Sequence, residues 1–284
     1  DKAMVDGYAV IAADSQPRTV IEEVTAGKVP SRSVTLGTAT RIMTGAPVPE
    51  GADAVVMVER TETLADGTVR LLEPSVTPDQ NIMRRAALMQ CGDVVLGRGT
   101  EVRPIEAGLL AEVGCSRPVV VPRPTAAVVA TGDELVAPHE VPAASQLRNS
   151  NGPLLVAAAR RAGAVPVDLG IAVDDFDDLE GKIVAGLASD ILLLSGGVSA
   201  GVLDLVPSVL EGLGVEQVFH KVQIKPGKPV WFGVKRSAAD GDGPPTLVFG
   251  LPGNPVSVWV CFELLVRPAI GALSGRGASS LTTS

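Results

Sequence analysis

Two stretches decide the fold of this chain: Thr125-Ala-Ala-Val-Val-Ala-Thr-Gly-Asp-Glu134 and Ile191-Leu-Leu-Leu-Ser-Gly-Gly197. Each begins as a continuous apolar run and then changes abruptly to glycine and polar residues. Short apolar runs of this kind are typical of strands that are buried on both faces, as in parallel sheets covered by helices. The polar residues then mark the carboxyl ends of those strands.

The segments around these two runs alternate between strand and helix patterns. We expect further strands at 165–169, 230–234 and 247–249, and helices at 154–162, 175–187, 204–213 and 256–270. Such alternation over about 150 residues predicts an α/β fold with a doubly wound sheet. We place this domain at residues 122–272, because Pro122-Arg123-Pro124 is typical of a boundary.

Residues 1–80 have short apolar runs separated by turn residues. The runs at 8–12, 20–24, 54–58 and 69–72 predict a small β-rich lobe, with a hairpin turn at Asp66-Gly67. Residues 81–121 predict a partial linking domain, with strands at 94–96 and 119–121 and a helix at 105–113 that begins after Pro104. Residues 273–284 are small and polar and predict a linker or tail.

Composition excludes several classes of partner. The 284 residues carry 24 basic and 32 acidic side chains, and the basic stripe of a nucleic-acid binder is missing. No apolar run reaches the roughly 20 residues of a membrane span. With no visible signal peptide either, we expect a cytoplasmic protein with no nucleic-acid or membrane partner. Cys91, Cys115 and Cys261 lack metal-ligand spacing and are expected to be free, buried thiols.

Ligands of open α/β sheets bind beyond the carboxyl ends of the strands. Four segments rich in glycine, proline, serine or charge are expected there: 131–135, 195–204, 221–228 and 250–257. Taken alone, the 195–201 loop is explained equally well as a mere tight turn. The 250–257 loop taken alone is better explained as a capped helix start, with Asn254 or Ser257 as the cap. Together they predict an anion site. Its candidate ligand-binding residues are Gly132, Ser195, Gly196, Gly197, Ser199, Lys228, Pro252, Gly253, Asn254, Pro255 and Ser257.

Three lysines, Lys221, Lys225 and Lys228, lie within eight residues of an acidic chain. Lys221 and Lys225 would share one face if the segment were a strand. The segment is then either an edge strand protected by solvated lysines or a site for phosphate or molybdate.

Carboxylates are expected at the same edge of the sheet. Asp133 and Glu134 follow the first strand, Asp174 and Asp175 follow the next, and Asp204 follows the glycine loop. Capping of the next helix explains Asp174 and Asp175 equally well. Carboxylates beside a phosphate site suggest Mg²⁺, with Glu134 and Asp204 as its candidate ligands. His139 and His220 are too isolated for a zinc site or a catalytic triad.

Ordered motifs in the sequence resemble the molybdopterin molybdenumtransferase family, which includes the gephyrin E domain. They are Asp6-Gly-Tyr-Ala9, Met43-Thr-Gly-Ala-Pro-Val-Pro49 with Gly51-Ala-Asp-Ala-Val-Val56, and the segments 131–135, 195–201, 224–229 and 250–257. The resemblance covers about residues 1–272. It implies a molybdopterin-binding α/β domain behind a β-rich N-terminal region.

The resemblance also implies a reaction. The family joins molybdate to adenylylated molybdopterin and releases AMP, assisted by Mg²⁺. By matching position, the implied catalytic residues are Asp6, Thr44, Glu134, Asp174, Asp204, Lys221 and Lys225. Family members are homodimers whose site is completed by the partner's N-terminal lobe, and molybdopterin adenylyltransferase is the implied second partner.

The chain departs from the family pattern at several positions. Arg84-Arg85 is followed by Ala86-Ala-Leu-Met89 where the family has Gly-Glu-Asp, and Ala3 and Val202 also differ from the usual residues. The family's helical segment before residue 1 and its C-terminal β domain are not in the sequence. Two hypotheses therefore remain: an active transferase, or a non-catalytic member that binds the pterin or scaffolds partner proteins. A third hypothesis, an unrelated nucleotide-binding protein, is weak because no Walker or dinucleotide motif is present.

Overall fold

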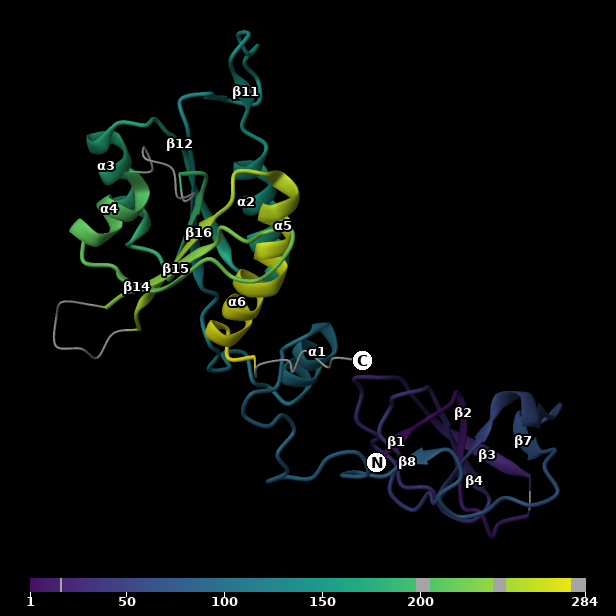
Figure 1. Ribbon diagram of the computed structural model, residues 1–284. Helices are drawn as coiled ribbons and strands as arrows, with labels where there is room; N and C mark the ends of the chain where they lie inside the picture. The colour runs from purple at the N-terminus through teal and green to yellow at the C-terminus, as the bar shows by residue number, and fades with distance from the viewer. Residues whose placement is uncertain (16, 198–204, 237–243, 277–284) are drawn as a thin grey trace. The chain divides into compact units, whose positions relative to one another are not determined.

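A computed structural model describes residues 1–15, 17–197, 205–236 and 244–276. The chain forms two compact units, Asp1–Gly97 and Arg98–Ser284, which are described separately (Figure 1). The finer domain boundaries, after residues 80, 121 and 272, stay predictions.

The first unit is built from strands, as its short apolar runs predict. Its elements are β1 (Lys2–Ala3), β2 (Gly7–Val10), β3 (Arg18–Val24), β4 (Thr38–Ile42), β5 (Ala54–Met57), a 3-10 helix (Val58–Arg60), β6 (Thr61–Thr63), β7 (Thr68–Leu71) and β8 (Ile82–Met83). The main sheet has the order β5-β2-β4-β3-β7-β6, and β1 pairs with β8. The predicted hairpin turn is confirmed between β6 and β7, where the Thr68 amide and hydroxyl donate to Asp66 Oδ1 over 2.9 and 2.7 Å.

The second unit contains the predicted α/β sheet. Its elements are α1 (Pro104–Glu112), β9 (Thr125–Thr131), β10 (Leu135–Val136), β11 (Leu147–Arg148), α2 (Asn151–Ala162), β12 (Val165–Ala172), α3 (Phe176–Gly186), β13 (Ile191–Ser195), α4 (Leu205–Gly212), β14 (Glu216–His220), β15 (Trp231–Lys235), β16 (Thr246–Leu251), α5 (Pro255–Cys261), a π-helix (Phe262–Val266) and α6 (Arg267–Leu273). The main sheet has the order β12-β9-β13-β16-β15-β14. The first four of these strands are parallel, and β15 is antiparallel to both of its neighbours.

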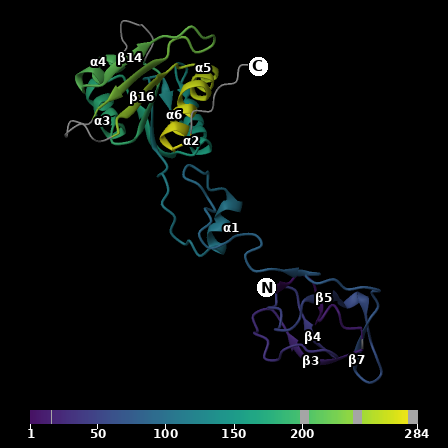
Figure 2. The same cartoon turned by 90° about the horizontal axis from the view of Figure 1, so that it is seen from below.

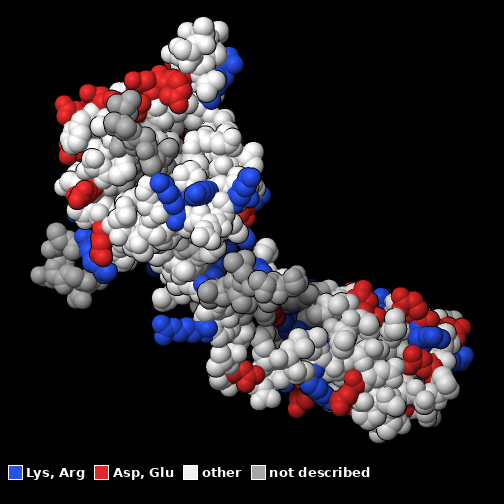
Figure 3. All heavy atoms as spheres, viewed as in Figure 1, with Lys and Arg blue, Asp and Glu red and all other residues white. Residues whose placement is uncertain are grey.

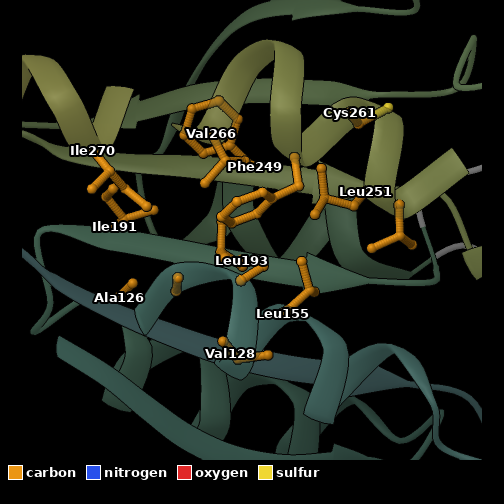
Figure 4. Close-up of a cluster of buried hydrophobic side chains, with 14 of the residues drawn as sticks. Ala126, Val128, Leu155, Ile191, Leu193, Phe249, Leu251, Cys261, Val266 and Ile270 are labelled. Carbon is orange, nitrogen blue, oxygen red and sulfur yellow. The ribbon is translucent and has the colours of Figure 1, made fainter. Parts of the chain in front are cut away.

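Helices cover both faces of this sheet, as a doubly wound fold requires. Helices α3 and α4 lie on one face, and α2, α5 and α6 lie on the other (Figure 2). Successive side chains of a strand point to opposite faces, so Ile191 and Leu193 pack in the cluster shown in Figure 4, while Leu192 and Leu194 pack in the cluster under α3 and α4. The central strands are therefore apolar at every position.

Two predicted strands of the linking segment are absent from the structure. Residues 94–96 lie in a turn region, where the Asp93 carboxylate accepts a hydrogen bond from the Gln90 amide over 2.8 Å. Residues 119–121 pair with no strand, and Val119 is fully exposed. Prolines at 118 and 122 remove backbone donors on both sides of this run. The predicted helix after Pro104 is confirmed as α1.

The expectation that 221–228 could be an edge strand is wrong. The edge strand is β14, which ends at His220, and Lys221 has a positive φ of 69° that turns the chain away from it. Two hydrogen bonds close the following loop, from the Lys221 amide to the Val230 carbonyl (2.8 Å) and from the Val222 amide to the Lys228 carbonyl (3.0 Å). The lysines therefore lie in a loop and not on one face of a strand.

The last predicted helix is found as one continuous helical segment of 19 residues, Pro255–Leu273, with a π-turn in its middle. By length and composition this segment could cross a membrane, although it contains Glu263 and Arg267 and is not an unbroken apolar run of about 20 residues. Val258, Phe262, Val266 and Ile270 on this segment are buried in the cluster against the sheet (Figure 4), as in a core helix. The absence of a membrane partner stays a prediction.

The cysteines are free, as expected, but only Cys261 is buried. Cys91 is exposed and Cys115 is half-buried, because both lie in the loop-rich segment before the sheet. Burial raises the pKa of the Cys261 thiol to about 11, so it is a neutral packing group.

We predict that Leu193→Ala destabilises the α/β unit by about 2–5 kcal/mol, because Leu193 is completely buried in the central strand β13. The matched control is Val167→Ala on β12, where the side chain is 39% exposed and the expected cost is below about 1 kcal/mol. Both tryptophans, Trp231 and Trp259, belong to this unit, so their fluorescence during urea unfolding measures it alone. Equal costs for the two variants would contradict the assignment of β13 to the core.

Candidate functional site

The sheet collects four polar segments at one edge. Strands β9, β13 and β16 are parallel and end at Thr131, Ser195 and Leu251. Strand β14 runs in the same direction as β16, because both are antiparallel to β15. The segments that start at 131, 195, 221 and 251 therefore leave the sheet at its carboxyl edge, as the sequence predicts.

A topological switch point lies within this edge. The chain leaves β9 for α2 on one face, and it leaves the neighbouring β13 for α4 on the other face (Figures 1 and 2). Diverging connections open a crevice between two adjacent strands, and open α/β sheets bind ligands there. Thr131 and Ser195 end the two strands that border this crevice.

The first glycine turn packs directly on the end of β9. Gly196 and Gly197 have φ values of 98° and 63°, and a Cβ on Gly196 would lie 2.6 Å from the Thr131 carbonyl oxygen. The Gly196 amide donates to the Leu251 carbonyl over 3.1 Å. Glycine is thus required by both conformation and space. The predicted residues Ser199 and Asp204 lie outside the described residues.

The carboxylates at this edge have different surroundings. The Glu134 carboxylate lies against the Cα of Gly132, where a Cβ would come within 2.5 Å of Oε2. Asp133 accepts a hydrogen bond from the Asp174 amide over 2.9 Å, which ties the segments after β9 and β12 together. Asp175 caps α3 by accepting from the amides of Asp177 and Asp178. Figure 3 shows acidic side chains gathered where α3 begins.

The three lysines of the 221–228 loop are exposed, and the loop is anchored from below. Gly227 lies so close to α5 that a Cβ there would be 2.8 Å from Cys261 Sγ, and the thiol contacts the Gly227 carbonyl oxygen at 3.5 Å. The buried Cys261 thus fixes the turn between Lys225 and Lys228 while both ammonium groups remain in solvent.

The second glycine loop is a capped helix start. Asn254 Oδ1 accepts from the amides of Val256 and Ser257 over 2.9 and 3.4 Å, and Pro255 at the first helical position has no amide hydrogen. The first-turn amides of α5 are therefore occupied, and Pro252 and Gly253 shape the turn before them. The capping explanation is the correct one for Asn254.

Asn151 was missed in the sequence, although it ties the start of α2 to the 250–257 segment. This residue begins α2, and its Nδ2 donates to the Gly253 carbonyl oxygen over 2.7 Å across 102 positions of the chain. An asparagine after a polar run gives no signal of such a contact, because the contact depends on the packing of α2 beside α5.

Asp6 and Thr44 are 38 positions apart in the sequence but are hydrogen-bonded to each other in the first unit. The Thr44 amide and hydroxyl both donate to Asp6 Oδ1, each over 2.7 Å. The pKa of Asp6 is held below its ordinary value mainly by the hydrogen bond from the Thr44 hydroxyl. The hydrogen bond from the Thr44 amide and the charge of Arg41 lower it further. The carboxylate is exposed and ionised, so it can act as an oxygen ligand or an acceptor.

The segment after Arg84-Arg85 is exposed. Arg84 pairs with Asp79 and Asp1, whereas Leu88 is 74% exposed. Ala86 has a φ of 67°, a conformation that glycine adopts more easily. The departure from the family pattern thus adds apolar surface and removes the carboxylates at this place.

The donor set suits a magnesium ion that is shared with a substrate. No group of three or more His, Cys, Asp or Glu side chains gathers in the part of the chain that the structure describes. Mg²⁺ commonly takes only one or two protein carboxylates and completes its shell with water and substrate phosphates. Glu134 is placed for this, and its predicted companion Asp204 lies outside the described residues.

The family models show the class to which this doubly wound domain belongs, the probable molybdopterin-binding domains. Residues 127–272 match the family described as a probable molybdopterin binding domain, and residues 1–114 match the MoeA N-terminal region, domains I and II. The chain belongs to the MoeA family, the molybdopterin molybdenumtransferases.

Relatives with these names match nearly the whole chain. The molybdopterin molybdenumtransferase of Staphylococcus aureus (strain N315) is 36% identical over 287 residues, covering 97% of this chain and 65% of the relative. That of Bacillus subtilis (strain 168) is also 36% identical, covering 95% and 64%. The crystal structure of a molybdopterin biosynthesis MoeA protein from Pyrococcus horikoshii superimposes with a TM-score of 0.75 at 33% identity, covering 97% of this chain and 68% of that one. This chain therefore spans about two thirds of the length of these relatives.

We predict that Thr44→Ala raises the pKa of Asp6 toward its ordinary value, because the variant removes the hydroxyl donor and keeps the amide donor. Because the pKa of Asp6 is lower in the folded state than in the unfolded state, its ionised carboxylate stabilises the folded unit at pH values above the ordinary carboxyl pKa. This stabilisation is lost as the pH falls below about 4. The Thr44→Ala variant should therefore lose less stability between about pH 5 and pH 3 than the wild type. A carboxyl ¹³C NMR titration measures the pKa directly, and an unchanged value in the variant would contradict the assignment.

Proposed function

We propose that the complete protein inserts molybdate into adenylylated molybdopterin and releases AMP, with Mg²⁺ bound to the substrate. The observation that carries this proposal is the carboxyl edge of the sheet, which collects exposed lysines, carboxylates, a glycine turn and a switch-point crevice. Membership of the family supports it, because its relatives bear the name of this transferase.

Each group has a chemical task in this proposal. Lys221, Lys225 and Lys228 bind the oxyanion end of the substrate or molybdate through charge-assisted hydrogen bonds. Glu134 and Asp204 would hold Mg²⁺, which would supply positive charge to neutralise the substrate phosphates. The glycine turn lets the substrate approach the backbone closely. Asp174 remains a candidate through its position beside Asp133.

The first unit supplies Asp6 and Thr44, which belong to a different compact unit from the lysines and Glu134. We propose that the protein is a homodimer in which a partner's first unit completes each site. Molybdopterin adenylyltransferase, which makes the adenylylated substrate, is the proposed second partner.

The homodimer proposal predicts a dimer mass in sedimentation at micromolar concentration, measured on the protein with the full length of its relatives. Activity should also return when an Asp6→Ala chain and a Lys225→Ala chain are mixed, since one site of the mixed dimer keeps both residues. A monomer with full activity would contradict the shared site.

A second candidate function is binding or scaffolding without catalysis. The exposed Ala86-Ala-Leu-Met89 segment favours it, because carboxylates of the family pattern are replaced there by apolar side chains. The retained Asp6, Thr44, Glu134 and lysines favour the transferase.

The transferase proposal predicts that Lys225→Ala weakens binding of the phosphorylated pterin roughly ten- to a hundredfold, because a hydrogen bond to a charged group contributes about 1.5–3 kcal/mol. The matched control is Lys28→Ala, which makes the same charge change on an exposed loop of the first unit. Cofactor reconstitution with molybdate and adenylylated pterin, over a magnesium titration, measures turnover. Equal affinity of the two lysine variants would show that Lys225 is only a solvated side chain.

The same assay separates the two candidate functions. A variant with Ala87→Gly, Leu88→Glu and Met89→Asp restores the family residues. If the restored variant turns over and the native chain does not, the native chain binds the pterin without catalysing the reaction.

A further inference from the structure

Buried polar atoms without a hydrogen-bond partner cluster at the candidate site. In the described part of the Arg98–Ser284 unit they are Thr131 Oγ1, Asn151 Oδ1 and Ser195 Oγ. All three belong to residues at the carboxyl edge of the sheet, at the ends of β9 and β13 and at the start of α2. Thr131 is 4% exposed and Ser195 is 2% exposed.

Unpaired buried polar groups are rare in folded proteins, because each keeps its desolvation cost without a compensating bond. A valine or alanine would fill the same space at no such cost. Three of these atoms at one edge therefore indicate groups whose partners arrive with a ligand.

The two hydroxyls flank the switch point from opposite faces. Thr131 follows Ala127 and Val129 on the α3/α4 face, whereas Ser195 follows Ile191 and Leu193 on the α2/α5 face. The turn at Gly196-Gly197 covers Thr131, since a Cβ on either glycine would lie 2.9 Å from its Oγ1. At these two positions the cover is backbone with no side chain.

Asn151 is held in a defined orientation. Its Nδ2 donates to the Gly253 carbonyl oxygen over 2.7 Å, which fixes its Oδ1 as the unpaired acceptor on the α2/α5 side of the crevice. The three unpaired groups are uncharged. The two hydroxyls can donate or accept a hydrogen bond, and the amide oxygen can only accept one.

The charged groups lie further along the edge. The lysine loop follows β14, which is three strands away from β13 in the sheet, and its Gly227 packs against Cys261 of α5. An anionic group bound by the lysines and an uncharged group bound at the crevice can thus belong to one extended ligand.

We propose that Thr131, Ser195 and Asn151 bind the flat nitrogen heterocycle of the ligand, whose edge offers N–H donors and ring acceptors, after the Gly196-Gly197 turn shifts to admit it. This inference rests on the proposed function, whose substrate carries two such rings, a pterin and an adenine. It assigns ring recognition to the crevice and phosphate recognition to the lysine loop.

The test compares Thr131→Val and Ser195→Ala with Thr40→Val in the full chain. Thr40 Oγ1 is also buried and unpaired, but it lies on β4 in the other unit, so its variant is a matched control. Binding of AMP, neopterin monophosphate and inorganic phosphate is measured by calorimetry, and thermal unfolding is followed on each variant. We expect the two site variants to keep or raise the unfolding temperature and to weaken AMP or neopterin monophosphate roughly three- to tenfold, with phosphate binding unchanged.

Each outcome decides the inference. Weakening of AMP alone assigns the adenine to the crevice, and weakening of neopterin monophosphate alone assigns the pterin. Unchanged affinity for both, or an equal loss for inorganic phosphate, overturns the inference and leaves the proposed function intact. If the wild-type chain binds none of the three, the proposed function fails as well.

Discussion

The burial of the three central parallel strands, β9, β13 and β16, on both faces is the constraint on which the rest of the α/β unit depends. Strands β12, β9, β13 and β16 run in one direction, so each must be followed by a connection that leaves from the same edge. The side chains of the central strands fill two apolar layers, and the polar residues of these strands lie at the strand ends. The chemistry of the unit is thereby collected at the carboxyl edge, however far apart its residues are in sequence.

The same constraint explains which elements could be predicted. Ile191–Leu194 and Ala126–Ala130 are apolar at every position because helices cover both faces, and such runs are easy to recognise. Residues 119–121 show the same local pattern, but flanking prolines and the lack of a neighbouring strand leave them irregular. Strand β14 was missed because Glu216, Gln217 and His220 lie at the polar edge of the sheet, where pairing with β15 and not burial makes the strand.

The location of the site was predictable from the sequence, but several of its contacts were not. Motif order indicated which segments meet at the edge, because carboxyl ends of parallel strands converge. Sequence left the use of Asn254 open, and the structure shows that it caps α5. Asn151 and Thr131 were missed as site residues, since their importance comes from an unpaired atom that only packing reveals.

Charged and uncharged recognition are separated in this site for a structural reason. The first-turn amides of α5 are taken by Asn254, and the Gly152 amide of α2 donates to Asn149 Oδ1 over 2.9 Å. These occupied amides cannot also bind an anion, so the proposed site relies on the lysine loop to attract phosphate. That loop is exposed, and its charges are screened by salt. The hydroxyls at the crevice are buried and neutral, so salt does not weaken them. An extended ligand would then be attracted through its phosphate and selected through its ring, and the placement of the two groups depends on the sheet and on α5, which anchors the lysine loop.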